Sequence, residues 1–159
     1  MRCNLFKERD ADIISGSRYL AHFAGDSLPP VERRQVNEHV TAEINHRLGL
    51  KLTDAFCGFK AYRTTALAQL DLTEPGYAMP LQLWVQAGRA GLKIEELPVP
   101  LIYLPNEKRS FGAVLDDAQT RIQYYHLVLD KEMAKSAARL APGSLSMGVG
   151  CCREGAGRC

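Results

Sequence analysis

Apolar positions recur along the chain with two different periods, and each change of period marks the boundary of an expected element. A short apolar run at 12–16 predicts a buried strand. Apolar residues at 31–48 repeat at near-helical spacing as far as Gly49, which predicts an amphipathic helix with a glycine stop. The alternation at 58–63 predicts a second strand, and a threonine after it can cap a short helix over 64–70.

The second half of the chain continues this alternation of elements. A helix predicted over 80–91 begins with a proline and ends with a glycine. Residues 93–104 have the composition of a strand, which two prolines push toward a sheet edge. A long helix follows, with an apolar face through 118–133. The segment 141–159 is rich in glycine and serine without a period, so we expect a disordered tail after one domain at 1–140.

Strands interleaved with helices predict an α/β domain. The length of 159 residues, with 46% hydrophobic and 24% charged residues, suits one globular domain. Three strands are few for a sheet that is covered on both faces. The pattern therefore predicts a domain that is incomplete on its N-terminal side.

Charge and cysteine usage narrow the functional classes. The formal net charge of +2 comes from 20 basic and 18 acidic residues of interspersed sign, which argues against nucleic-acid binding. Five cysteines without C-x-x-C spacing indicate reduced thiols and a cytoplasmic protein. The first residues are charged and lack an apolar core, so we expect no signal peptide there. The helix at 115–133 can face a core or a bilayer surface, so peripheral contact with the inner membrane face stays open, and core packing is the preferred prediction.

Four segments in series point to one family. They read ADIISGSRY at 11–19, DAFCGFKAYR at 54–63, GY at 76–77 ahead of the Trp84 helix, and EELPV at 95–99. In that order they resemble the second half of the dolichol-phosphate mannosyltransferase-like family 2 glycosyltransferases, over most of the chain.

The resemblance implies a partial GT-A type fold whose nucleotide-binding half is missing. It also implies inverting transfer of a hexose from a nucleotide sugar, such as GDP-mannose or a UDP-hexose, to a polyprenyl phosphate or related acceptor. A complete family domain is expected to use a divalent metal, Mg²⁺ or Mn²⁺, but we identify no metal ligands in this chain. The family's donor-binding strands would lie before Met1, so we expect a truncated chain that transfers no sugar alone.

The acceptor-side residues of the family match named positions here. Arg18 matches an arginine that holds the acceptor phosphate, and Arg33 with Asn37 matches an Arg-x-x-x-Ser pair. A surface arginine on a turn is the alternative for Arg18, and a solvated helix face is the alternative for Arg33. Asp54 is the second candidate catalytic residue, and it could orient the acceptor or cap its own turn.

A basic loop completes the candidate site. Lys108, Arg109 and Ser110 fall where the family has a mobile loop that closes over phosphates, although an ordinary solvated turn would look the same. Gln82 stands where the family pattern has a glutamate, and an amide cannot act as a proton acceptor. Cys57 replaces a family serine, and we interpret it as a small buried residue rather than a nucleophile.

Two patterns resemble metal sites but lack the sequence context of one. Asp10-Ala11-Asp12 matches the D-x-D metal signature of GT-A enzymes but follows a charged run instead of an apolar strand. The four histidines, His22, His39, His46 and His126, show no ligand spacing and are expected at the surface or in the core.

Three hypotheses remain open from the sequence. The first is a glycosyltransferase in truncated form. The second is a non-catalytic module that keeps a binding surface for lipid phosphate or a partner protein around Arg18 and Arg33. The third is an unstable fragment, whose exposed sheet edge would promote aggregation.

Overall fold

A three-stranded mixed sheet forms the base of the molecule. The computed structural model describes residues 6–103 and 110–140. The strands are β1 (Ile13–Ser17), β2 (Lys60–Tyr62) and β3 (Ile94–Pro98), in the order β2-β1-β3. β1 pairs antiparallel with β2 and parallel with β3. The described chain is thus α/β, as the alternation of elements predicts.

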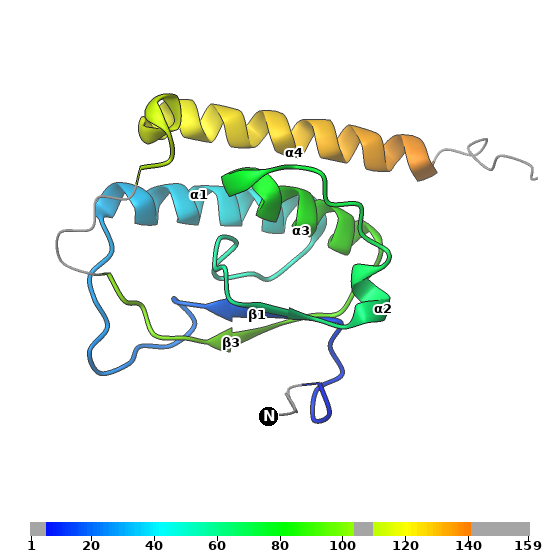
Figure 1. The fold of residues 1–159 in the computed structure, drawn as a ribbon, viewed down its shortest axis with the longest axis horizontal. Helices are drawn as coiled ribbons and strands as arrows, with labels where there is room; N and C mark the ends of the chain where they lie inside the picture. The colour runs from blue at the N-terminus through cyan, green and yellow to red at the C-terminus, as the bar shows by residue number, and fades with distance from the viewer. Residues whose placement is uncertain (1–5, 104–109, 141–159) are drawn as a thin grey trace, which may run out of the picture.

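The longer helices are stacked in layers over one face of this sheet. The helices are α1 (Val31–Leu48), α2 (Thr64–Leu67), α3 (Met79–Arg89) and α4 (Ala118–Leu140), with short 3₁₀ turns η1 (Gly76–Ala78) and η2 (Ala113–Asp116). In Figure 1, α1 and α3 lie between the sheet and α4, which runs along the top of the view. The short α2 follows the end of β2.

Helix α1 has the bounds that the apolar period predicts. Gly49 ends it in the left-handed conformation, at a φ of 66°, which glycine adopts without a Cβ penalty. Val36, Val40 and Ile44 form its buried stripe. The prediction that Val31 belongs to this stripe is wrong, because Val31 is 72% exposed. It lies in the first turn, and the packed part of the helix begins one turn later.

Trp84 lies at the centre of the core. Its side chain is fully buried among residues of β1, α1, α3 and α4. Its indole N–H donates to the backbone carbonyl of Ala55 at 2.9 Å. A buried indole needs such a partner, since an unpaired N–H would cost free energy in the core. The core is therefore tied directly to the turn that follows Thr53.

The long helix α4 packs on the core through its predicted apolar face. Tyr125, Val128 and Leu129 are buried, and Ile122 and Met133 pack against the same cluster. The prediction that this helix faces the core is confirmed. Among the described residues, no helix combines the length and the hydropathy that a crossing of the bilayer requires.

The strands after the first are shorter than their sequence patterns suggest. β3 ends at Pro98 instead of continuing to 104, and the Leu101 N–H, on the side of the strand that faces β1, donates to Asp26 Oδ1 at 2.9 Å instead. Val99, the residue after Pro98, donates its N–H to the carbonyl of Ser17 at 2.9 Å, and the chain then becomes irregular. β3 is an edge strand of the described sheet, as its prolines predict. The predicted tail at 141–159 lies outside the described residues.

Arg63 fixes the segment that leads into β1. Its Nε donates to the carbonyl of Ala11 at 2.6 Å, and its Nη2 donates to the carbonyls of Arg9 and Phe6. Arg63 directly follows β2, so one side chain at the end of β2 holds the entry to the central strand. Charged donors to backbone carbonyls are among the stronger hydrogen bonds in proteins.

Replacing Trp84 with phenylalanine should lower the free energy of unfolding by about 2–4 kcal/mol, from the unpaired Ala55 carbonyl and the space left by the indole. Urea unfolding followed by far-ultraviolet circular dichroism measures this change. Leu28→Ala is the matched control, because Leu28 is 93% exposed and its loss should cost less than about 0.5 kcal/mol. Equal stabilities of the two variants would contradict this account of the core.

Candidate functional site

Arg18 and Asp54 form a paired group just past the end of β1. The Nε of Arg18 donates to Asp54 Oδ2 at 2.6 Å, and its Nη2 donates to Oδ1 at 2.9 Å. The backbone N–H of Arg18 also donates to Oδ2, at 3.2 Å. This is the two-pronged geometry in which guanidinium and carboxylate fit best. The structure thus places two of the residues predicted from the sequence in direct contact.

Asp54 collects donors from three parts of the chain. Its side chain is fully buried, and besides Arg18 it accepts from Asn37 Nδ2 at 2.8 Å and from the N–H of Phe56 at 3.2 Å. Burial alone would raise the pKa of the Asp54 carboxyl. The hydrogen bonds and charge of Arg18, with the Asn37 bond, outweigh it and lower that pKa below its usual value. Asp54 therefore stays ionised and holds Arg18 in place.

Glu96 supports the turn on which Asp54 sits. Its carboxylate on β3 accepts from the Thr53 N–H at 2.8 Å, the Thr53 hydroxyl at 2.7 Å and the Asp54 N–H at 3.1 Å. The Thr53 hydroxyl also lies 2.5 Å from that of Ser17. In the sequence, Glu96 stands out only as a member of the fourth segment, EELPV at 95–99, and no role was predicted for it. The available signal was its place in a strand expected to run parallel to β1, which would bring Glu96 to the same edge of the sheet as Arg18 and Asp54.

Asn37 is oriented from within α1. Its amide oxygen accepts from the hydroxyl of Thr41, one turn later, at 3.2 Å, and its NH₂ points to Asp54. The Thr41 hydroxyl in turn accepts from the N–H of Ala55 at 3.2 Å. Asn37 thus reaches the Asp54 carboxylate with a hydrogen-bond donor.

A cavity of about 330 Å³ opens in front of this pair. Arg18, Arg33 and Arg121 line it, and no acidic side chain of the described residues does. Its aromatic lining consists of Tyr19, Phe56, Tyr77, Tyr103, Phe111 and Tyr125. Three guanidinium groups among aromatic rings suit a ligand that has both an anionic group and an apolar part.

Arg33 and Arg121 both lie close to the ring of Phe111. Their guanidinium carbons are 5.0 Å and 4.4 Å from the centre of its ring. Arg121 is buried, donating to the carbonyl of Leu115 and to Glu32 at 2.9 Å each. Sequence reasoning predicted Arg33 and missed Arg121. The available signal was a basic residue near the start of a helix with an apolar face. That signal does not tell which part of the molecule the side chain contacts.

The predicted basic loop is only partly described. Lys108 and Arg109 lie outside the described residues. Ser110 is exposed, and its hydroxyl donates to Asp116 Oδ2 at 2.7 Å while accepting from the N–H of Gly112. Ser110 does not line the cavity, whereas its neighbour Phe111 does.

Gln82 belongs to the helix interface instead of the cavity. Its amide oxygen accepts from the N–H groups of Thr73 and Glu74 at 2.8 Å, and its Nε2 donates to Glu132 on α4 at 3.0 Å. Gln86 donates to the other oxygen of Glu132 at 2.8 Å. Glu132 is buried, so it needs donors there, and a glutamate at position 82 would oppose it with a second carboxylate. The requirement of Glu132 for a hydrogen-bond donor therefore explains why position 82 carries an amide instead of a carboxylate.

The aspartates of the D-x-D pattern do not fit a metal site. Asp10 forms an ion pair with the ammonium group of Lys93, and Asp12 accepts from the Lys93 N–H at 2.9 Å. The Asp10 carboxylate is therefore paired with the Lys93 ammonium group, and the Asp12 carboxylate with the Lys93 backbone N–H. Cys57 is buried, as expected for a small packing residue, and a Cβ on Gly16 would come within 3.0 Å of its sulfur.

Two curated proteins align with the chain. The low-salt glycan biosynthesis hexosyltransferase Agl6 of Haloferax volcanii is 28% identical over 104 residues, which are 65% of this chain and 25% of that protein. The undecaprenyl-phosphate mannosyltransferase of Micrococcus luteus is 27% identical over 124 residues, which are 75% of this chain and 50% of that protein. No family model and no solved structure matches. The similarity supports a glycosyltransferase relationship, and the aligned parts span half or less of each relative.

Asp54→Asn should lower the free energy of unfolding by about 3 kcal/mol at pH 7, because it leaves the half-buried Arg18 without its counter-charge. The native pKa of Asp54 is depressed, so the stabilisation is complete above about pH 4, the unfolded-state pKa, and is lost as the pH falls through the native value. The difference between the proteins should therefore shrink on acidification. Urea unfolding at several pH values measures it, with Asp130→Asn, in an exposed ion pair, as control.

Gln82→Glu should destabilise the protein by about 1–3 kcal/mol, since it sets two carboxylates against each other in the α3–α4 interface. The exchange Gln82→Glu with Glu132→Gln restores one donor and one acceptor and should recover part of the loss. Chemical denaturation of the wild type, both single variants and the double variant gives the coupling free energy. Strictly additive losses would show that the two side chains do not interact.

Proposed function

We propose that this chain is the acceptor-binding part of a glycosyltransferase that moves a hexose from a nucleotide sugar to a polyprenyl phosphate or a related acceptor. The observation that carries the proposal is the Arg18–Asp54 pair at the mouth of a cavity lined by three arginines. The two relatives, a hexosyltransferase and an undecaprenyl-phosphate mannosyltransferase, support the same class of reaction.

An acceptor phosphate needs positioning more than activation. Its oxygen is already anionic, so it can attack the anomeric carbon while the bond from that carbon to the nucleotide diphosphate breaks, which inverts the configuration. Arg18 has five N–H donors on its side chain, and Asp54 accepts from two of them. The other three are available to a phosphate, with Arg33 on the neighbouring helix as a second cation. Holding the two reactants in line is the main contribution of such a site.

The aromatic part of the lining suits the rest of the acceptor. Tyr77 and Phe111 contact each other edge to face, with ring centres 4.7 Å apart, and form one wall of the cavity. The cavity volume of about 330 Å³ falls within the usual range for small-molecule sites, roughly 300–1,000 Å³. It accommodates a phosphate with the first isoprene unit or a sugar ring, while a longer lipid would continue outside.

Asp54 and Asn37 act in this proposal as positioning residues. Asp54 lies behind Arg18, and its depressed pKa makes it unsuited to accept a proton near neutral pH. Asn37 lines the cavity and braces the same carboxylate. Lys108, Arg109 and Ser110 are proposed to close over the phosphates, since the described end of that loop already brings Phe111 to the cavity wall.

The donor side of the reaction is assigned to no residue of this chain. A nucleotide sugar such as GDP-mannose or a UDP-hexose would supply the hexose, and Mg²⁺ or Mn²⁺ would accompany its diphosphate. The Asp10 and Asp12 carboxylates are engaged with Lys93 and are not proposed as its ligands. A polyprenyl-phosphate acceptor implies work at the cytoplasmic membrane face, with peripheral contact through the acceptor itself.

Binding of farnesyl phosphate, a short soluble polyprenyl phosphate, tests the proposal. Calorimetric titration of the full chain should show binding that weakens with added salt, because the phosphate is held by charge. Arg33→Gln should weaken it by about 10-fold or more, the worth of one charge-assisted hydrogen bond. Arg18→Lys should also weaken it, since lysine keeps the charge but loses the planar fork.

Three comparisons make that titration decisive. Arg89→Gln, at the exposed end of α3, should bind as the wild type does. Farnesol, which lacks the phosphate, should bind at least about 10-fold more weakly. Wild-type levels of binding in Arg33→Gln, or equal binding of farnesol, would refute the acceptor site.

A non-catalytic binding module is the second candidate. It is favoured because all the residues assigned above bind the acceptor, and none of the described residues is assigned to the nucleotide sugar. It predicts farnesyl phosphate binding with neither binding of nucleotide sugars nor transfer of labelled hexose. Transfer by the purified full chain would exclude this candidate. It would also overturn the expectation of no transfer stated from the sequence.

A further inference from the structure

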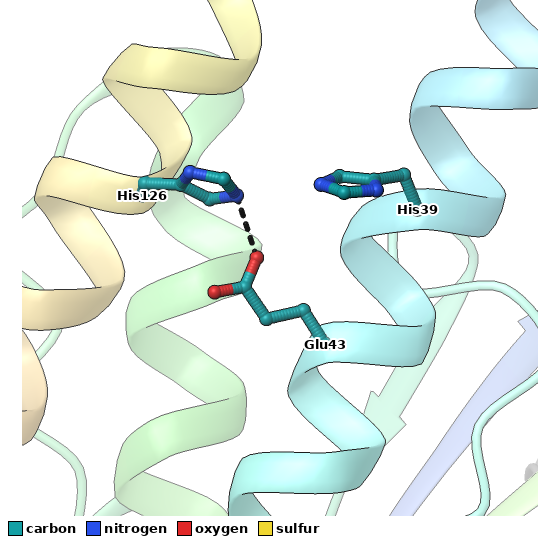
Figure 2. A group of neighbouring side chains, drawn as sticks. All are labelled: His39, Glu43 and His126. Atoms are coloured by element: carbon teal, nitrogen blue, oxygen red, sulfur yellow. Dashed lines mark ion pairs between the residues drawn. The ribbon is translucent and has the colours of Figure 1, made fainter.

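Three side chains that the proposed acceptor site does not use converge between α1 and α4. His39 and Glu43 come from α1, and His126 comes from α4 (Figure 2). One ligand atom from each lies within 4.8 Å of the other two. His39 is exposed, and Glu43 and His126 are half-buried, so the group sits at the rim of the helix interface and is open to solvent on one side.

The backbone positions explain the convergence. Residues four apart on a helix lie on the same face, so Glu43 lies one turn beyond His39 and points the same way. α4 packs across α1 and brings His126 opposite both, with its ring centre 5.6 Å from that of His39. The sequence shows no ligand spacing among the histidines themselves, and the structure brings two of them together with Glu43. The set combines an i, i+4 pair with a residue 83 positions after Glu43, on another helix, which a search for spaced histidines misses.

The polar atoms at the centre of the group are paired by charge and not by a hydrogen bond. Glu43 Oε2 and His126 Nε2 lie 2.6 Å apart, an ion pair when the histidine is protonated (dashed in Figure 2), but the pair lacks the geometry of a hydrogen bond. Both atoms are buried, and neither has a hydrogen-bond partner in the described structure. Buried polar atoms without hydrogen-bond partners are rare in proteins and call for an explanation. A bound metal ion between the two atoms is one such explanation.

The surroundings of Glu43 match those of a metal-binding carboxylate. Arg47, one turn further along α1, forms an ion pair with Glu43 Oε1, and it also donates to Asp130 on α4 at 2.5 Å. It thereby fixes the carboxylate and leaves Oε2 turned toward the histidines. Bonds of this kind orient ligands in known metal centres. The positive charge of Arg47 reduces the attraction for a cation, and Asp130 partly neutralises it.

We propose that His39, Glu43 and His126 bind a divalent transition-metal ion of the zinc type. Two imidazoles and one carboxylate are a common ligand set for zinc, with a solvent molecule as the fourth ligand. Bond lengths of about 2.0–2.2 Å place tetrahedral ligand atoms roughly 3.3 Å apart. The ligand atoms here reach that spacing by small side-chain rotations. Imidazole ligands disfavour Mg²⁺ and Mn²⁺, so this site is distinct in chemistry from any donor-side metal.

Such an ion would clamp α4 to α1. Both helices contribute walls to the arginine-lined cavity, with Arg33 and Asn37 on α1 and Arg121 and Tyr125 on α4. Tyr125 directly precedes the ligand His126. The ion would therefore stabilise the packing that shapes the cavity, whether or not the cavity binds a lipid phosphate.

Zinc titration of the full chain tests the site directly. Cys3, Cys151, Cys152 and Cys159 are first replaced by serine, because cysteine thiolates are themselves zinc ligands. Calorimetry should then show one equivalent of zinc bound and an increase in Tm, while Mg²⁺ produces neither. His126→Ala and His39→Ala should each weaken zinc binding by at least about 100-fold. This exceeds the loss of about 10–100-fold that follows removal of a residue that only hydrogen-bonds to a metal ligand.

His46→Ala is the matched control, since His46 is an exposed histidine on the same helix and should leave zinc affinity unchanged. Co²⁺ in place of zinc should give visible bands without the intense thiolate absorption in the near ultraviolet. Absence of binding at millimolar zinc, or the same affinity in His126→Ala as in its parent, would overturn the proposal. Neither result depends on farnesyl phosphate binding, so the two proposals fail separately.

Discussion

The buried carboxylate of Asp54 is the group on which the arrangement of the site depends. Removing a charge from water costs several kcal/mol, and it is tolerated only when donors surround the ion. The donors come from the end of β1, from α1 and from the turn that carries Asp54 itself. Three segments that are distant in the sequence must therefore meet at one point. Arg18 is directed by this requirement and not by its own loop.

The rest of the described molecule holds that point in place. Glu96 binds the turn from the sheet side, and Trp84 binds it from the core through the carbonyl of Ala55. Gln82 and Gln86 join α3 to α4 through Glu132. These bonds fix the position of α4, which lines the cavity with Arg121 and Tyr125. Each of these links is a polar group satisfied inside a packed interface. Such links set geometry more sharply than apolar contacts do, because hydrogen bonds are directional.

The sequence predicted what depends on local pattern. The bounds of α1, the edge position of β3 and the buried face of α4 all follow from period, glycine and proline. The positions of Arg18, Asp54 and Asn37 came from the family resemblance, and the structure brings these three together. The roles of Glu96, Arg121 and Glu132 could not be predicted. Each depends on a contact across many residues, such as Arg121 with Glu32, and no local pattern encodes the partner.

The anchoring of the first segment by Arg63 has a practical consequence for handling the protein. Ala11, whose carbonyl Arg63 holds, precedes β1, whereas Arg18 follows the opposite end of that five-residue strand. In Figure 1 the segment before β1 lies on the side of the sheet away from the helices. A chain attached to a sensor surface through this described segment before β1 would thus be held near the end of β1 that lies away from Arg18. That orientation leaves the cavity facing the solution, which suits immobilised measurements with bulky lipid ligands.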